Sequence, residues 1–261
     1  MKKFFISIFI LIFPLLLMAG VNKTEFIKKF SEAQKIQRNN LSGQVQIKLY
    51  MGNFPVKIRG NFWRKGPLYK TNMLMLIPNS SHPLKYITIF DGKTIWRISN
   101  GTIVKLTVNK LPKQISAFGT INDFLKNVKK YSKETKITEK TKNNKKYYVF
   151  TSIGKNINYN IAGYQKILFW DDIIICIKTL PYNISGIQKI VLWINEKNML
   201  TKQIELYGKN KQPDVLIVFK NLSTKPIHNS MFIYKPSQKT KVVDLTKMVK
   251  SVILHMNNLF L

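Results

Sequence analysis

The chain has 261 residues, of which 45% are apolar, so it is long enough and apolar enough to bury a core of its own. Its one cysteine, Cys176, stands in an apolar run, so an internal disulfide is excluded and a buried small hydrophobe is expected. The formal net charge of +31 comes almost wholly from lysines spread along the chain, which argues against nucleic acid and leaves an anionic membrane surface or compositional drift as the explanation.

Residues 1–20 have the three parts of a secretory signal. Two lysines precede an apolar run over residues 4–18, and the small residues Ala19 and Gly20 follow it as a cleavage site. The run is short for a membrane span, and no cysteine stands near it to carry a lipid anchor. We expect residues 1–20 to be a cleaved signal peptide and residues 21–261 to work in the periplasm. An uncleaved signal that tethers the protein to the inner membrane is the alternative.

An amphipathic helix is predicted next, over residues 24–38. Its apolar residues recur at helical spacing, with lysines and Glu32 on the opposite side. Asn22 or Thr24 can cap its start. The predicted apolar face is formed by Phe26, Ile27, Phe30, Ala33 and Ile36.

The period of the apolar residues then changes to two, which predicts strands with one apolar and one wet face. The clearest strands cover residues 45–49, 56–62, 73–77, 85–90, 134–140, 145–152, 187–194, 200–207, 215–220 and 231–234. Asp91-Gly92 and Asn100-Gly101 are the strongest hairpin turns.

Three further segments complete the predicted domain. A second helix is expected over residues 121–131, an inserted hairpin or lid over residues 155–183, and an amphipathic carboxy-terminal helix over residues 245–257. The chain contains neither a long polar linker nor an internal repeat. We therefore predict one α+β domain, a strongly curved antiparallel sheet of about ten strands closed by two or three helices.

The sequence offers few groups for catalysis. His82, His228 and His255 stand far apart, and no metal-ligand spacing, nucleophile elbow or phosphate-binding loop occurs. The only acidic pair, Asp171-Asp172, is read as a turn. We expect no enzyme activity, no catalytic residue, no metal site and no cofactor. The alternating apolar side chains then have two interpretations, an ordinary core or the lining of a cavity that binds by burial.

Four motifs carry a resemblance that favours the cavity. Residues 62–67, 90–96 and 192–200 each look like a strand with its turn, and residues 226–236, followed by 242–245, form the fourth motif. In this order and spacing they resemble LolA-like proteins, the periplasmic outer-membrane lipoprotein carrier and sorting family of the LolA/LolB superfamily. The resemblance covers most of residues 24–246.

The resemblance implies an incomplete, half-open β-barrel closed by helices. Its concave apolar lining is expected to hold lipoprotein acyl chains, taken from an inner-membrane ABC transporter and passed to an outer-membrane receptor, without cofactor or covalent chemistry. On the matching strands, the residues expected to bind the ligand are Ile47, Leu49, Ile58, Phe62, Ile89 and Trp96. Family members often carry a latching arginine for the helical lid where Gly66 stands, so the latch would shift to Arg64.

Two functions follow as hypotheses. The first is a monomeric periplasmic carrier that binds lipoprotein acyl chains, or another lipid, for transfer from the inner to the outer membrane. The alternative is an envelope sensor or assembly factor on the same fold, which binds a protein or an anionic lipid through its basic surface without carrying cargo. The sequence does not name the cargo.

Overall fold

A computed structural model describes residues 21–51, 54–76, 78, 80–99, 101–107, 134–157, 187–238 and 240–247. The predicted signal, the second helix, Cys176 and His255 lie outside these ranges, as do the acidic pair, most of the predicted insertion and nearly all of the predicted carboxy-terminal helix.

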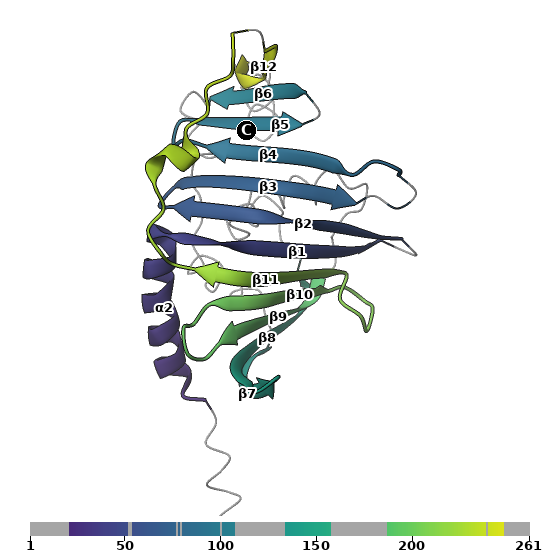
Figure 1. The fold of residues 1–261 in the computed structure, drawn as a ribbon. Helices are drawn as coiled ribbons and strands as arrows, with labels where there is room; N and C mark the ends of the chain where they lie inside the picture. Colours follow the sequence, from purple (N-terminus) through teal and green to yellow (C-terminus); the bar gives the residue numbers. More distant parts are fainter. Residues whose placement is uncertain are drawn as a thin grey trace, which may run out of the picture.

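Twelve strands in the described ranges form one sheet, accompanied by an α-helix and a short 3-10 helix. The elements are α2 (Lys23–Asn39), β1 (Leu41–Met51), β2 (Phe54–Lys65), β3 (Leu68–Leu76), β4 (Leu84–Phe90), β5 (Thr94–Ser99), β6 (Thr102–Thr107), β7 (Glu134–Lys142), β8 (Lys145–Ile157), β9 (Ile187–Asn195), β10 (Thr201–Tyr207), β11 (Val215–Ser223), η2 (Asn229–Phe232) and β12 (Val242–Asp244). Their spatial order is β12-β6-β5-β4-β3-β2-β1-β11-β10-β9-β8-β7 (Figure 1). Every neighbouring pair is antiparallel except β12 and β6, which run parallel.

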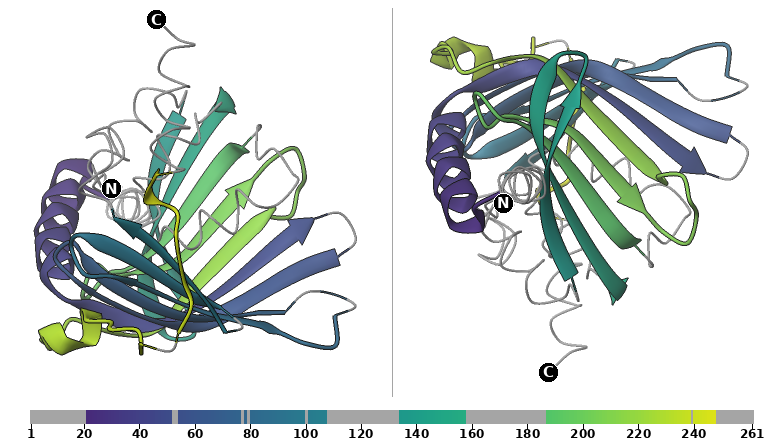
Figure 2. Two further views of the ribbon diagram at one scale, coloured as in Figure 1. Left: turned by 90° about the horizontal axis from the view of Figure 1, so that it is seen from above. Right: turned by 90° about the horizontal axis from the view of Figure 1, so that it is seen from below.

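The sheet is strongly curved and does not close into a barrel. Figure 2 shows it wrapping around an interior, and its edge strands β7 and β12 are not paired with each other. Helix α2 lies across one end of the strands (Figure 1). The predicted fold class, an α+β domain built on an incomplete antiparallel barrel, is confirmed by this arrangement.

Helix α2 begins where the sequence predicts. The side chain of Asn22 accepts hydrogen bonds from the backbone N–H groups of Thr24 and Glu25, at 3.1 and 3.2 Å, and is the cap. Phe26 and Phe30 are buried and stack on each other with ring centroids 5.6 Å apart. Both belong to the main apolar cluster, so the helix closes one end of the curved sheet.

The far end of the helical face differs from the prediction. Ile36, assigned to the apolar face, is 60% exposed, whereas Gln37 is only 8% exposed. The Gln37 amide donates a hydrogen bond to the backbone carbonyl of Met199, at 3.3 Å, in the turn between β9 and β10. A buried amide with a partner therefore replaces the expected aliphatic contact, because the helix meets a turn here instead of a strand face.

The predicted strand over residues 231–234 is wrong, since these residues contribute to η2 and the loop that follows it. The ring nitrogen Nδ1 of His228 accepts a hydrogen bond from the backbone N–H of Ser230 and caps this short helix. The last strand is instead β12, which adds to the edge of the sheet beside β6. The hydroxyl of Thr246 accepts from the backbone N–H of Thr107 at 2.9 Å and holds the end of β12 in place.

Gly60 provides a test of how tightly the strands pack. A Cβ at this position would stand 2.1 Å from the carbonyl oxygen of Asn72 and 2.6 Å from Sδ of Met73. We expect Gly60→Ala to lower the free energy of unfolding by roughly 1–3 kcal/mol because backbone would have to move. Gly66→Asn is the control, since Gly66 has φ +56° with nothing within 4 Å of its Cβ position, and asparagine tolerates that conformation. Urea unfolding that showed equal stability for both variants would contradict the prediction.

Candidate functional site

Apolar side chains on the concave face form a continuous row across nine strands. Each member is the cross-strand partner of the next, so the row follows from the register and not from proximity alone. In spatial order the row is Ile137, Phe150, Leu192, Ile204, Ile217, Ile47, Ile58, Met75 and Leu84. Neighbouring strands lie about 4.8 Å apart, so the row is roughly 38 Å long along the curve of the sheet.

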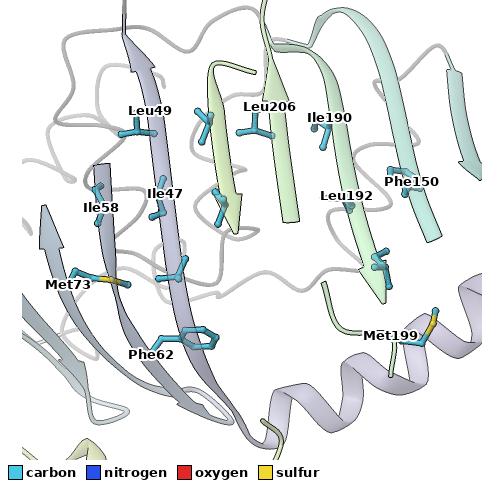
Figure 3. Packing of buried hydrophobic residues seen from close by; sticks show 14 of the residues in the cluster. Ile47, Leu49, Ile58, Phe62, Met73, Phe150, Ile190, Leu192, Met199 and Leu206 are labelled. Atoms are coloured by element: carbon cyan, nitrogen blue, oxygen red, sulfur yellow. The ribbon is translucent and has the colours of Figure 1, made fainter. Parts of the chain in front are cut away.

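A second, shorter row lies beside the first on the same face. It runs through Ile190, Leu206, Val215, Leu49 and Val56 on five adjacent strands. Figure 3 shows side chains of both rows pointing to the same side of the sheet. Their common orientation results from the alternation of side chains along a strand, which every one of these strands keeps.

The predicted ligand-binding residues divide between the two faces of the sheet. Ile47, Leu49, Ile58 and Phe62 lie together on the concave face, each no more than 3% exposed. Phe62 is the cross-strand partner of Thr71, and Thr71 is the partner of Thr88. Thr88 is therefore on the concave face, and its neighbour Ile89 points to the opposite face. Trp96 is the cross-strand partner of Ile89 and lies on the outer, convex face with it.

Ile89 and Trp96 belong to a second packed layer on the outside of the sheet. The carboxy-terminal segment, residues 224–247, runs along this side from the end of β11 to β12 (Figure 1). The rings of Trp96 and Tyr234 make an edge contact at 5.4 Å, and Ile89 and Phe232 are 3% and 1% exposed. The contact between Trp96 and Tyr234 therefore joins the carboxy-terminal segment to the convex face.

Arg64, the predicted latch, lies at the end of β2. Its Nε donates a hydrogen bond to the carbonyl oxygen of Gly66, at 3.1 Å, within the turn that leads to β3. Its cross-strand partner is Tyr69, whose ring packs against that of Phe90 at a centroid distance of 5.6 Å. Its described contacts thus stabilise the turn between β2 and β3.

The concave face becomes polar toward β5. Thr71 and Thr88 are buried neighbours on this face, and the guanidinium of Arg97 lies 5.1 Å from the ring centre of Tyr86. At the opposite side, burial raises the pKa of the Tyr148 phenol. The arrangement is suited to apolar groups along its middle and to polar groups at one rim.

No described helix combines the length and the apolar character that crossing a membrane requires. Within the described ranges, no three histidine, cysteine, aspartate or glutamate side chains are grouped so that they could hold a metal ion.

No family model matches the sequence, and no curated protein matches it. Solved structures do resemble it. An uncharacterized conserved protein from Thermus thermophilus has 9% identity and a TM-score of 0.48, with 85% of this chain and 98% of that chain covered. Lipoprotein LppX from Mycobacterium tuberculosis has 6% identity and a TM-score of 0.46, with 79% and 99% covered. A LolA superfamily protein from Nitrosomonas europaea has 12% identity and a TM-score of 0.30, with 79% and 96% covered.

At these identities and TM-scores the likenesses carry no argument about this chain. Its own architecture, a strongly curved sheet that remains open with a helix across one end, agrees with the fold that the sequence motifs led us to expect.

Ile89→Ala tests the assignment of this residue to the outer layer. We expect the substitution to lower the free energy of unfolding by roughly 2–5 kcal/mol, because it leaves a cavity beneath the carboxy-terminal segment. Ile233→Ala is the control, since Ile233 belongs to the same segment but is 60% exposed; its effect should stay within about half a kcal/mol. If urea unfolding gave similar small losses for both variants, the packed outer layer would be refuted.

Proposed function

We propose that this protein is a carrier that binds the acyl chains of lipids, lipoproteins among them, on the concave face of its sheet. The observation that carries the proposal is the apolar row across nine strands on the inside of a sheet that does not close. Binding by burial needs no reacting group, so the proposed carrier performs no covalent chemistry and requires no cofactor.

The size of the row agrees with this ligand class. The hydrocarbon core of a bilayer is about 30 Å thick, so one acyl chain extends about 15 Å. The row, at roughly 38 Å, is long enough for more than one chain. Burial contributes about 0.8 kcal/mol per CH₂, or about 11 kcal/mol gross for a chain of about fourteen methylene groups, before the cost of ordering the lipid.

Helix α2 accounts for only one end of this apolar face. With 17 residues it is about 25 Å long, and within the described ranges it packs Phe26, Phe30 and Ala33 against the cluster. The row continues past it to Met75 and Leu84 on β3 and β4. Met75 is half-buried there and Leu84 is 36% exposed, so a lipid would remove apolar surface of this stretch from water.

A polar group stands beside the second apolar row. Ser152 is the cross-strand partner of Ile190, is fully buried, and its hydroxyl has no hydrogen-bond partner among the described residues. The carbonyl of an ester-linked or amide-linked acyl chain would accept a hydrogen bond from this hydroxyl. Such a bond would compensate the buried donor and favour acylated molecules over plain hydrocarbon.

The place of the carrier in the cell follows from the sequence motifs. We place it in the periplasm as a monomer, where it receives its cargo from an inner-membrane ABC transporter and delivers it to an outer-membrane receptor. Protein recovered from the periplasm and examined by native mass spectrometry should carry lipid. Recovery free of lipid, together with failure to bind a fluorescent fatty acid, would refute the carrier function.

Met75 and Leu74 provide a matched pair for the binding face. They are neighbours on β3, both are half-buried, and they point to opposite faces of the sheet. We expect Met75→Glu to weaken binding of a fluorescent fatty acid by roughly tenfold or more, because a carboxylate must then be buried beside the acyl chain. Leu74→Glu, on the convex face, should leave the affinity unchanged. Circular dichroism checks that both variants fold, and equal affinities would show that the ligand does not lie on the concave face.

A further inference from the structure

An open groove of about 920 Å³ lies at the end of the sheet near α2. The turn between β7 and β8, the turn between β9 and β10, and the end of β11 form its walls. Six lysines line it together with a single acidic residue, Glu196. These lysines are Lys142, Lys145, Lys146, Lys197, Lys202 and Lys220.

The groove lies back to back with the apolar row. Leu192 belongs to the row, and its neighbour on β9, Trp193, points to the convex face and lines the groove. Tyr147 and Gln203 line it from the adjacent strands and are on the same outer face. These three side chains therefore face away from the lining proposed for acyl chains, and the inference drawn from them does not depend on that proposal. Phe219 and Leu222, which pack on the main apolar cluster, line the groove only at its β11 wall.

Trp193 is held rigidly beside the lysines. Its ring meets that of Tyr147 edge-on at 6.0 Å, and its Nε1 donates to a carboxylate oxygen of Glu205 at 2.9 Å. The ammonium groups of Lys140 and Lys142 lie 5.7 and 5.3 Å from the centre of the Trp193 ring. The ring is thus occupied by cations and is not presented as a platform on which a nucleic-acid base would stack.

Among the described residues, no ion pair neutralises the lysines of the groove. The two ion pairs within these ranges join Lys29 to Glu25 and Lys105 to Asp244. Burial, and after it the neighbouring Lys145, lower the pKa of Lys202. Crowded like charges of this kind are relieved when an anion binds between them.

We propose that this groove docks the protein onto a bilayer surface that contains anionic phospholipid. The lysines would bind the lipid phosphates as point charges, and Trp193 and Tyr147 would lie at the level of the headgroups, where amphipathic rings are favoured. Lysine instead of arginine, and aromatic rings next to the cations, favour this partner over nucleic acid.

Three groove lysines test the proposal. In a vesicle sedimentation assay with the full chain, we compare phosphatidylcholine vesicles with mixed phosphatidylcholine and phosphatidylglycerol vesicles. Subtracting the binding to phosphatidylcholine vesicles from the binding to mixed vesicles removes any contribution of apolar segments that insert into both. Each lysine near an anionic surface strengthens binding about fivefold, so Lys145→Gln, Lys202→Gln and Lys220→Gln together should weaken the anion-dependent binding by about a hundredfold. Added salt should weaken binding of the unaltered protein.

A second triple variant controls for total charge. Lys48 of β1 and Lys209 and Lys211 of the loop between β10 and β11 are exposed and do not line the groove. The two loop lysines lie at the end of β10 and β11 opposite to Lys202 and Lys220. Changing all three control lysines to glutamine removes the same charge and should weaken binding far less. Equal losses in the two triple variants would mean that only the net charge matters, and would overturn the groove as a docking site.

Two further measurements identify the source of the anion and distinguish failure of the docking proposal from failure of the carrier function. Inorganic phosphate should displace the protein from vesicles no better than chloride at equal ionic strength; specific displacement would indicate a site for a small anion and refute bilayer docking. Met75→Glu should bind anionic vesicles like the unaltered protein. The docking proposal can thus fail while fatty acid binding persists, and the reverse outcome is equally distinguishable.

Discussion

One residue from each of nine strands lies on the same line across the concave face, and the need to keep most of this apolar row out of water determines much of the rest of the structure. Only its last member, Leu84, is 36% exposed. Since side chains alternate along a strand, a slip of one residue in any pairing would move that strand's apolar side chains to the outside. The register is therefore specified over the whole width of the sheet. Curvature then brings the rows toward α2, whose Phe26 meets Tyr148 of β8 at a ring distance of 5.2 Å.

Local patterns predicted the elements of this sheet well because period and turn chemistry are local properties. The alternation at Val45, Ile47 and Leu49 needs no distant information, and the three side chains are all buried. The turn at Asp91-Gly92 is equally self-contained, since the Asp91 carboxylate accepts the backbone N–H groups of Lys93 and Thr94, and Gly92 has φ +96°.

The side on which Ile89 and Trp96 lie could not be predicted in the same way. β4 is apolar on both faces, with Tyr86 and Phe90 buried on one and Ile89 buried on the other. Alternation identifies a face only where one side of the strand is wet, and here the carboxy-terminal segment covers the outside. The second layer depends on the contact between Trp96 and Tyr234, two residues that are some 140 positions apart in the sequence.

Gln37 illustrates the same limit on a helix. Ile36 has the more apolar side chain, yet Gln37 is buried because its amide finds a carbonyl 162 residues later in the chain. Likewise, Met231 and Phe232 have strand-like composition but lie in a 3-10 helix capped by His228. For Gln37 the deciding partner is a distant carbonyl whose position only the folded chain supplies, whereas the cap of the 3-10 helix is local, since His228 lies two residues before Ser230.

Strand β9 places the two proposed binding surfaces one residue apart. Leu192 faces the apolar row and Trp193 faces the lysine groove, so the strand separates an apolar environment from an anion-binding one by the thickness of the sheet. A carrier needs this separation, because the contact with the membrane must be reversible while the acyl chain stays buried. Attraction between exposed lysines and lipid phosphates decays over about 8 Å at physiological salt, so it acts only at contact. Burial of the acyl chain involves no charge, so salt does not screen it, and it persists after the protein leaves the surface.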